Sequence, residues 1–554
     1  MGTVIRIQER SAQDDGFHAV VSFDHGPAYP ITVRDPFDQK QEEELQWYFE
    51  RHIKFPFTQK VRARDAAASI TTYGEALFKH VFQDNADVYA EYKALLKVGL
   101  EQVQIEVAGS PKFHALHWEA LKDPQLSKPF ALQATMVRRN MQPPPIEASV
   151  QPSPTINLLV VTSRPYGARD VSYRTISRPL VEALGQSDLR VDIDILRPGT
   201  YKTLENHLRE ITGKHGAGYY HVIHFDLHGS LLSYQQWQHL LEQEEGEGEQ
   251  VSHSRTYQKY YALTDIEQYE DEKAFLFFEG EQDNAVTPVE ASALANMLRE
   301  HHIPIAILNA CQSGKQVKQV GDSETSLGSS LMQAGVQLVL AMGYSITVSA
   351  AALLMKALYR HLFAGENLSL VIRHARNELY NDKKRRVYYA QQIDLEDWLL
   401  PVVYQNRPVQ LIMRELAPEE NNAYYEHKAE LARSAPPEPT YGFLGRDLDI
   451  LRIERRLLLK RNILLVRGMG GAGKTTLLRH LGAWWRTTGL VERVFYFGYD
   501  DRAWSRQQIM VEIAQQLLDP VAYVRDFQPL SLDAQQAKLA ALLSPSLSAV
   551  LWSP

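Results

Sequence analysis

The stretch Ile156-Asn-Leu-Leu-Val-Val-Thr162 is a short run of mainly apolar and β-branched residues. Such a run is typical of a strand that is buried on both faces of a sheet. Four runs of similar length follow at 191–196, 220–226, 303–308 and 336–341, and amphipathic segments long enough for helices separate them. This alternation predicts βαβ units, and therefore a largely parallel sheet with helices on both faces.

The residues before this region predict a smaller mixed α/β unit. Apolar and polar residues alternate at 17–23 and 103–107, as they do in strands. Helical periodicity appears at 42–52 and 74–82. We therefore expect an α/β support in front of the main sheet.

Two proline-rich stretches, at 141–154 and 434–439, can continue neither a helix nor a central strand and are interpreted as linkers. The second lies in a stretch that is also rich in glutamate, which favours a semi-rigid spacer. The predicted segments are an α/β support at 1–140, a linker at 141–155, the main α/β domain at 156–415, a linker at 416–440 and a C-terminal α/β domain at 441–554.

Length and composition fit an ordinary multidomain globular chain. At about 150 residues per domain, 554 residues suffice for three or four domains. The hydrophobic share of 44% and the charged share of 23% exclude disordered and collagen-like chains. The net charge of −8 excludes a global basic field, so we expect neither nucleic acid nor a membrane as a direct partner.

The N-terminal residues, the length of the apolar stretches and the cysteine content together indicate the compartment. The first residues lack the apolar run of a secretory signal, and no apolar stretch approaches the ~18 to 20 residues that span a bilayer. The chain has one cysteine, Cys311, which excludes an intramolecular disulfide and a cysteine-based zinc cluster. We therefore expect a cytoplasmic protein.

Ligands bind at the carboxyl ends of strands in open parallel sheets, and two of the predicted strands end in reactive groups. The run 220–226 is followed by Leu227-His228-Gly229, and the run 303–308 by Asn309-Ala-Cys311. A cysteine nucleophile needs a base to form thiolate and backbone N–H groups to bind an oxyanion, and glycine at 229 would let the backbone approach a substrate. A free cysteine is more often a small buried apolar side chain, so spacing alone leaves both interpretations open.

Other residues near these strand ends have structural interpretations. His224 and Asp226 would share the face of His228 on one strand by alternation. We interpret His224 as structural because it lies inside the apolar run. We interpret Asp226 as a paired strand-end carboxylate, with orientation of the site or lining of a substrate pocket as its alternative. The acidic insert 242–250 is expected to be a surface loop, or else a gating or self-cleaved loop. The basic run 383–386 is expected to be a solvated helix end.

The segment from about 156 to 404 resembles the CHAT domain, a caspase-like cysteine peptidase family related to caspases and separases. The resemblance rests on four stretches: Tyr220-His-Val-Ile-His-Phe-Asp-Leu-His-Gly229, Leu308-Asn-Ala-Cys-Gln-Ser-Gly314, Ser326-Leu-Gly-Ser-Ser-Leu-Met-Gln-Ala-Gly335 and Asp397-Trp-Leu-Leu-Pro-Val-Val-Tyr404. Residues 116–121 and 130–138 also resemble the pseudo-protease-like support that commonly precedes the CHAT core.

The resemblance implies a caspase-like three-layer sandwich. It implies His228 as the general base, Cys311 as the nucleophile, and the backbone N–H groups of Gly229 and Cys311 as the oxyanion hole. The substrate would be a protein, and the peptidase would need no cofactor. The sequence departs from the pattern at Asn309, where basic-specific relatives place an acid, and at 343–349, where many CHAT sequences read Trp-Pro-x-x-Asp.

The segment 441–554 carries a second motif. Asn462-Ile-Leu-Leu-Val466 predicts a buried strand, and the glycine-rich stretch 467–476 follows it and opens a predicted helix. Strand, G-x-x-x-x-G-K-T and helix in this order are typical of a Walker A loop. Lys474 would reach the β and γ phosphates of ATP or ADP, and the Thr475 hydroxyl would ligate Mg²⁺. The expected nucleotide-binding residues are Gly468, Gly470, Gly471, Gly473, Lys474, Thr475 and Thr476.

Phe443-Leu-Gly-Arg-Asp447 resembles the leading motif of STAND signalling NTPases of the NB-ARC and NACHT type. The later apolar run 549–552 is the expected Walker B strand, but Ser553-Pro554 follows it instead of an acidic pair. We therefore expect a partial P-loop module in a truncated reading frame or fragment, one that binds nucleotide and lacks the acid needed for hydrolysis.

Together these features predict a signal-activated cysteine endopeptidase coupled to a nucleotide-binding switch. The resemblance to bacterial proteins of this architecture implies a defence or cell-death effector, with a protein substrate, nucleotide and further copies of the chain as partners. Two other classes of function stay open. One is a non-catalytic adaptor that uses the CHAT fold for binding, and the other is a nucleotide-dependent assembly switch.

Overall fold

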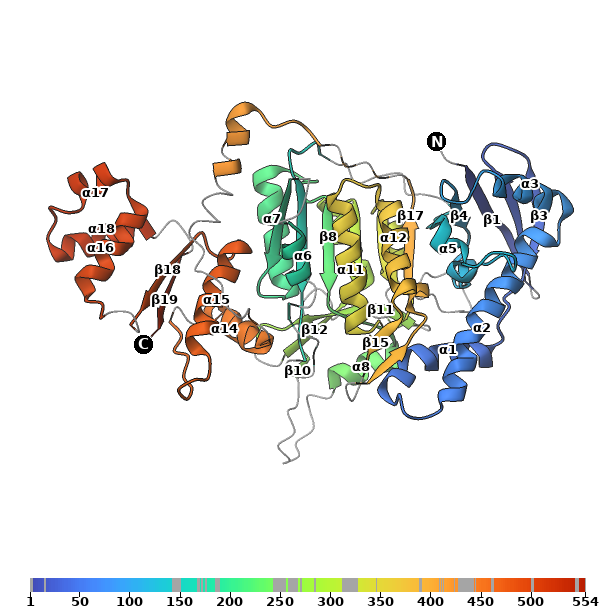
Figure 1. Cartoon of the computed structure of the whole chain (residues 1–554), viewed down its shortest axis with the longest axis horizontal. Helices are drawn as coiled ribbons and strands as arrows, with labels where there is room; N and C mark the ends of the chain where they lie inside the picture. The colour runs from blue at the N-terminus through green and yellow to red at the C-terminus, as the bar shows by residue number, and fades with distance from the viewer. Residues whose placement is uncertain are drawn as a thin grey trace. The chain divides into compact units, whose positions relative to one another are not determined.

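The chain folds into two compact units, one formed by Met1–Asp192 and Pro198–Arg414 and the other by Ile193–Arg197 and Glu415–Pro554. The computed structural model shown in Figure 1 describes residues 3–13, 16–141, 151–166, 170, 173–174, 177–184, 190–242, 256–257, 268–269, 272–282, 285–310, 327–344, 346–387, 391–407, 409, 411, 413–422, 424–426, 443, 445–459, 463–499, 503–543 and 548–553.

A large mixed sheet forms the centre of the first unit, and residues 193–196, which fall in the range of the second unit, belong to its last strand. Its order is β3-β2-β1-β4-β5-β17-β14-β13-β8-β6-β7. The strands are β1 Val4–Gln13, β2 Gly16–Phe23, β3 Ala28–Val33, β4 Gln104–Ala108, β5 Thr135–Arg139, β6 Ile156–Thr162, β7 Val191–Leu196, β8 Val222–Asp226, β13 Ile305–Asn309, β14 Leu338–Met342 and β17 Pro401–Gln405. The pairs β6–β8, β8–β13 and β13–β14 are parallel, which confirms the predicted mostly parallel sheet.

The predicted apolar runs fall on these strands. The runs 156–162 and 191–196 coincide with β6 and β7, whereas β8, β13 and β14 each begin two residues later than predicted. The apolar residues just before these three strands are buried without being part of the strand. Hydropathy indicates which residues are buried and not which backbone groups pair. The strands predicted from it therefore begin too early.

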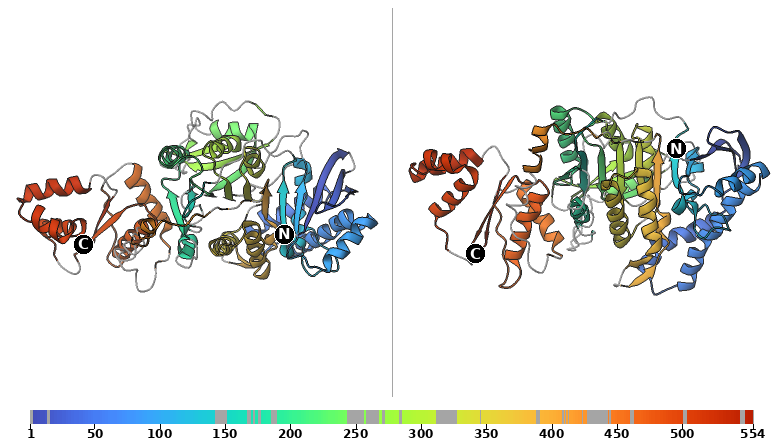
Figure 2. Two further views of the ribbon diagram at one scale, coloured as in Figure 1. Left: turned by 90° about the horizontal axis from the view of Figure 1, so that it is seen from above. Right: turned by 45° about the horizontal axis from the view of Figure 1, so that its top comes forward.

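Helices cover the sheet. They are α6 Ser177–Leu184, α7 Tyr201–His215, α9 Ala291–Glu300, α10 Leu327–Gln333, α11 Val348–Phe363 and α12 Leu368–Asn381. Helix α11 packs against α6 and α12, and α10 packs against α9. Figure 2 (left) shows α11 and α12, in olive, on one side of the strands and green helices on the other. The arrangement is the layered α/β architecture that the sequence predicts.

The N-terminal residues continue the same sheet. Strand β5 pairs with β17, with Arg138 opposite Tyr404, so segments 1–140 and 156–415 share one sheet. The helices here are α1 Gln39–Glu50, α2 Lys60–Phe78, α3 Ala86–Leu96 and the short helices α4 Pro111–His114 and α5 Phe130–Gln133. Arg138 also forms an ion pair of 2.6 Å with Glu119, and both side chains are buried. Glycine is required at position 74 of α2, because a Cβ there would lie 1.8 Å from the carbonyl oxygen of Ala120.

A smaller sheet is inserted between β8 and β13. Its strands are β9 His228–Ser233, β10 Thr256–Tyr257, β11 Glu272–Glu279 and β12 Ala285–Glu290, in the order β10-β12-β11-β9. The prediction that His224 and His228 share one strand is wrong, because β8 ends at Asp226 and His228 begins β9. A single residue, Leu227, separates strands of two different sheets.

The basic run at 383–386 is also not a helix end. Helix α12 ends at Asn381, and Lys384–Arg386 forms β15, which pairs with β16 at Gln392–Asp394. Arg385 is buried and binds both carboxylate oxygens of Asp397, at 2.5 and 2.9 Å. A buried carboxylate, rather than solvent, therefore accounts for the position of this arginine.

The second unit contains helices and a parallel pair of strands. Its elements are α14 Asp447–Leu459, α15 Lys474–Thr487, β18 Arg493–Gly498, α16 Arg506–Leu517, α17 Pro520–Asp526, α18 Leu532–Leu543 and β19 Ser548–Ser553. Strand β19 covers the predicted run 549–552 and pairs with β18. Of the predicted linker 416–440, residues 418–422 and 424–426 are helical, and 427–440 lie outside the described residues.

The predicted buried strand at 462–466 is wrong. Residues 463–466 have no regular structure, and Ile463 and Leu465 are 86% and 70% exposed. An isolated strand leaves its backbone N–H and C=O groups without partners. In the described part of this unit, β18 and β19 pair only with each other, so this run joins no sheet.

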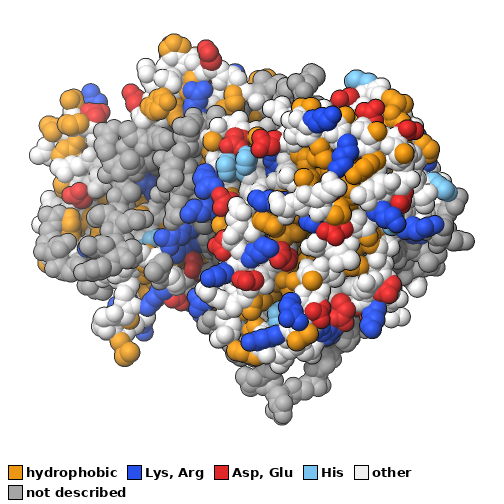
Figure 3. All heavy atoms as spheres, turned by 45° about the vertical axis from the view of Figure 1, so that its right-hand side comes forward, with side chains coloured by type: hydrophobic (Ala, Val, Ile, Leu, Met, Phe, Trp, Pro, Cys, Tyr) orange, Lys and Arg blue, Asp and Glu red, His pale blue; other side chains and the backbone are white. Residues whose placement is uncertain are grey.

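On the face of the molecule shown in Figure 3, basic and acidic side chains are interspersed, and no large patch of one sign is visible. Within the described residues, no helix has both the length and the apolar character that crossing a bilayer requires.

Candidate active site

The carboxyl ends of β6, β8 and β13 meet at one edge of the main sheet. The parallel register places Thr162, Asp226 and Asn309 side by side. The Asn309 side-chain amide donates to Oδ1 of Asp226 at 2.9 Å. This edge is where an open parallel sheet binds its ligands.

Asp226 is a buried, paired carboxylate. Its Oδ2 lies 2.5 Å from Nη2 of Arg164, and Nη1 of the same guanidinium donates to the Asp226 main-chain oxygen at 2.7 Å. The two side chains are 4% and 5% exposed. Both carboxylate oxygens are therefore occupied, by Arg164 and by Asn309. These contacts favour the interpretation of Asp226 as a paired strand-end carboxylate.

His228 is fixed by a second carboxylate at the same edge. Its Nε2 contacts Oδ1 of Asp170, whose side chain is fully buried. The main-chain N–H of Tyr166 donates to Oδ2 of Asp170 at 2.5 Å, and the Tyr166 ring packs edge-on against the imidazole at 5.0 Å. The His228 side chain remains 34% exposed, and its Nδ1 has no hydrogen bond to a described residue. A buried carboxylate thus orients one ring nitrogen of a histidine whose side chain is partly exposed.

The smaller sheet, rather than the main one, positions this histidine. His228 lies opposite Phe277 in the antiparallel pair β9–β11. Beneath the pair is an apolar cluster, against which Tyr166 also packs; its buried members are Leu232, Trp237, Phe275, Phe277 and Val286. The cluster therefore holds both β9 and the residue that packs on the imidazole.

Sequence reasoning missed Asp170. It belongs to no recognised motif and lies in the loop after β6. One signal could have found it, because a loop that leaves the carboxyl end of β6 must start beside the end of β8. A carboxylate in that loop was a candidate partner for the histidine.

His224 is structural, as predicted. Its side chain is fully buried in β8, and Nδ1 lies 2.6 Å from the Tyr359 hydroxyl of α11. Burial lowers the pKa of His224 to about 4, so the ring is neutral at physiological pH.

The structure places only part of the predicted catalytic set. His228 and Gly229 lie next to each other in β9, and Gly229 pairs with Leu276. Cys311 lies outside the described residues, two positions beyond Asn309 along the chain, as do residues 243–250 of the acidic insert.

The predicted nucleotide-binding residues form one loop and the start of one helix. Gly471 and Gly473 have φ angles of 74° and 76°, which favour glycine, and α15 begins at Lys474. The Lys474 ammonium group turns back onto this loop and donates to the carbonyl oxygens of Gly468 and Met469, at 3.0 and 2.9 Å. Thr475 follows in the first turn of the helix. These residues are therefore brought together at the N-terminus of a 14-residue helix.

Comparisons with known proteins place the main domain in a family. This chain is similar to separase in two crystal structures of the separase–securin complex of Saccharomyces cerevisiae, at 3.0 and 2.6 Å resolution. The sequence identities are 9% and 8%, and the TM-scores are 0.40 and 0.36. The similarity covers 73% and 75% of this chain, and the chain spans 30% of each separase chain. No curated protein matches. The family model of the CHAT domain matches residues 71–424, which is more than half of the sequence. The chain therefore belongs to the CHAT domain family.

Proposed function

We propose that this chain is a caspase-like cysteine endopeptidase that cleaves a protein substrate without a cofactor. The observation that carries the proposal is the His228–Asp170 contact at the carboxyl edge of the parallel strands. A buried carboxylate engages one imidazole nitrogen, and about a third of the His228 side chain is exposed. The strand that leads to Cys311 ends at the same edge, at Asn309.

In the proposed reaction, Nδ1 of His228 takes the proton of the Cys311 thiol, and the thiolate attacks the carbonyl carbon of the scissile peptide. The oxyanion that forms accepts hydrogen bonds from the backbone N–H groups of Gly229 and Cys311. The intermediate collapses with breakage of the C–N bond, and the imidazolium gives its proton to the leaving amine. Water then attacks the thioester, with His228 as base, and releases the acid and the thiol.

Asp170 is a positioning residue in this proposal. Its Oδ1 accepts a hydrogen bond from the Nε2–H group, which fixes the imidazole tautomer that presents an unprotonated Nδ1 to the thiol. The same carboxylate stabilises the imidazolium when Nδ1 is protonated. It needs no contact with the substrate.

The proposal is tested by screening a peptide library with the full chain and with two variants, Cys311→Ala and His228→Ala. We expect cleavage by the parent and none by either variant, with folds that remain intact. The double variant should be no worse than either single one, because members of a catalytic unit act together. Equal cleavage by the parent and by a variant would contradict the assignment, and a parent that cleaves nothing would favour the adaptor class.

A second candidate function, nucleotide binding, has its own supporting observation. The Lys474 ammonium group lies against loop carbonyls at the start of α15, where backbone N–H groups also point out of the helix. We propose that this loop binds the phosphates of ATP or ADP, with the Thr475 hydroxyl on Mg²⁺. In a STAND-like module, bound nucleotide would promote self-association and so activate the peptidase in response to a signal, as a defence or cell-death effector does.

Nucleotide binding is tested by titrating the full chain with MgATP and MgADP in a calorimeter. Lys474→Ala should remove most of the affinity. Lys538→Ala, which changes a lysine on α18 of the same unit, should bind as the parent does. Binding that is equal in all three proteins would contradict a phosphate site at this loop.

A further inference from the structure

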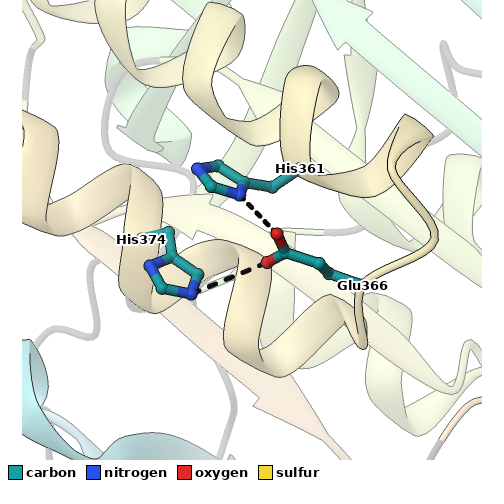
Figure 4. A group of neighbouring side chains, drawn as sticks. All are labelled: His361, Glu366 and His374. Atoms are coloured by element: carbon teal, nitrogen blue, oxygen red, sulfur yellow. Dashed lines mark hydrogen bonds and ion pairs between the residues drawn. The ribbon is translucent and has the colours of Figure 1, made fainter. Parts of the chain in front are cut away.

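Two histidines and a glutamate converge where helices α11 and α12 meet. His361 lies in the last turn of α11, His374 lies within α12, and Glu366 lies in the connection between the helices. One potential ligand atom from each residue falls within 4.8 Å of the others. Figure 4 shows the Glu366 carboxylate between the two imidazole rings. The peptidase and nucleotide proposals use none of these residues.

Hydrogen bonding accounts for only half of this arrangement. His361 Nδ1 lies 2.7 Å from Oε1 of Glu366, as in an ordinary hydrogen bond. His374 Nε2 is directed at the other oxygen, Oε2, at 3.6 Å, which is too long for one. That oxygen is buried and has no hydrogen-bond partner. A buried carboxylate oxygen that faces an imidazole nitrogen across such a gap requires a further explanation.

We infer that His361, Glu366 and His374 form a binding site for a zinc-class divalent transition-metal ion. Two imidazoles and one carboxylate are donors that Zn²⁺ prefers, and three protein ligands leave a fourth position for water. With bonds of about 2.0–2.2 Å, tetrahedral coordination separates ligand atoms by about 3.4 Å. The two imidazole–carboxylate separations, 2.7 Å to Oε1 and 3.6 Å to Oε2, lie on either side of that value, and one ligand atom from each of the three residues falls within 4.8 Å of the others. Metal binding would therefore require the side chains to rotate until both nitrogens and one carboxylate oxygen reach this spacing.

The two imidazole rings must turn before they can share one ion. They are nearly parallel in the structure, 15° apart, with centroids at 4.7 Å, whereas the lone pair of each ligating nitrogen lies in the plane of its own ring. Arg360 contacts Nε2 of His361 at 3.4 Å and Glu378 at 2.9 Å. When metal occupies Nδ1 of His361, the proton of this ring moves to Nε2, and Arg360 keeps its contact with Glu378.

Topology indicates what the ion does. Strand β14 runs toward the candidate active-site edge, and α11 follows it and runs back, so His361 lies toward the opposite edge of the sheet. The ion therefore takes no part in the proposed cleavage. It would clamp the α11–α12 hairpin two residues from Tyr359, which holds buried His224 in the sheet. The proposed role is structural, and it does not depend on the peptidase assignment.

The test uses the full chain as the Cys311→Ala variant, so that the active-site thiol cannot bind metal. After chelator treatment, the protein is titrated with ZnCl₂ by calorimetry and with CoCl₂ by visible absorption. We expect one equivalent of Zn²⁺, the visible bands of low-coordinate Co²⁺, and a rise in the midpoint of thermal unfolding on metal addition.

Three variants in this background, His361→Gln, Glu366→Gln and His374→Gln, should each lose the Co²⁺ bands and the thermal shift. His18→Gln, which removes an exposed histidine on β2, is the matched control and should retain both. Circular dichroism without metal checks the fold of each variant. If one variant fails to fold, the test rests on the other two. Absence of stoichiometric binding in the parent, or binding that survives in the folded variants, would overturn the site.

Discussion

Asp170 belongs to no sequence motif, and its contact with His228 gives it a part in the proposed chemistry. Asp170→Asn keeps the size of the side chain but removes the negative charge and the preference for one imidazole tautomer. We expect kcat for peptide cleavage to fall roughly 100-fold with little change in KM, because the residue touches no substrate. The alkylation rate of Cys311 should fall with it.

Two further variants separate positioning from a general loss of stability. Asp170→Glu retains the carboxylate and should recover part of kcat, whereas the exposed control Asp84→Asn should behave as the parent. If Asp170→Asn instead raised KM alone, or lowered stability and left kcat unchanged, the carboxylate would have no role in orienting His228.

His224 gives the first unit a specific pH dependence. Burial lowers its pKa to about 4 in the folded chain, whereas the ordinary value of 6.5 applies in the unfolded chain. Between pH 6.5 and 4 the unfolded chain binds a proton that the folded chain does not, so the free energy of unfolding falls as the pH falls. The expected loss from pH 7 to pH 5 is about 2 kcal/mol.

Denaturant unfolding at pH 7 and pH 5 measures this loss. In His224→Gln the part of this loss that comes from protonation of His224 should disappear. The variant should also be less stable at pH 7, because glutamine packs less well than the buried imidazole. An unchanged difference between the two pH values would mean that His224 does not titrate as its burial requires.

At the scale of elements, the strands of the main sheet could be predicted because each is a short apolar run with a helix-length segment after it. Runs 156–162 and 191–196 therefore matched β6 and β7. The change of sheet at Leu227 could not be predicted, since periodicity shows which residues are buried and not which strands they pair with. The buried strand predicted at 462–466 was wrong in burial as well as in pairing, because Ile463 and Leu465 are exposed and no described strand pairs with this run. Asp170 was missed because its contact depends on the path of a loop.

The smaller sheet is the element on which the histidine depends. Trp237 of α8, at Tyr234–Glu242, stacks on Phe275 at 4.8 Å within its apolar cluster. Trp237→Ala should open this cluster, raise the hydrogen-exchange rates of amides in β9 and β11, and lower kcat/KM. Amides of the main sheet should exchange as before.

Trp237→Phe is the matched variant, because it keeps an aromatic ring in the cluster, and it should retain most of the exchange protection and activity. Unaltered exchange in Trp237→Ala would show that the cluster does not hold β9. Faster exchange with full activity would show that the placement of His228 is independent of the smaller sheet.

At the scale of the whole molecule, the two units carry separate proposed activities. Lys474→Ala should weaken MgATP binding and leave basal peptide cleavage within about threefold of the parent, a barrier change of roughly 0.6 kcal/mol. The reason is that the hydrogen bonds of the Lys474 ammonium group to described residues go to carbonyls of its own loop, and this lysine takes no part in the proposed peptidase chemistry. A large loss of cleavage in a folded Lys474→Ala chain would mean that the nucleotide loop gates the active site.

If Cys311 is a nucleophile activated by His228, its thiol should be alkylated unusually fast, and the alkylation rate measures this activation. Because the chain has one cysteine, mass spectrometry of the iodoacetamide-treated protein reports that residue alone. We predict stoichiometric labelling at pH 6 to 7 that is faster in the folded chain than in denaturant, and that slows to the rate of an ordinary thiol in His228→Ala. A thiol that is inert in the folded chain, or that reacts equally fast with and without His228, would contradict the account.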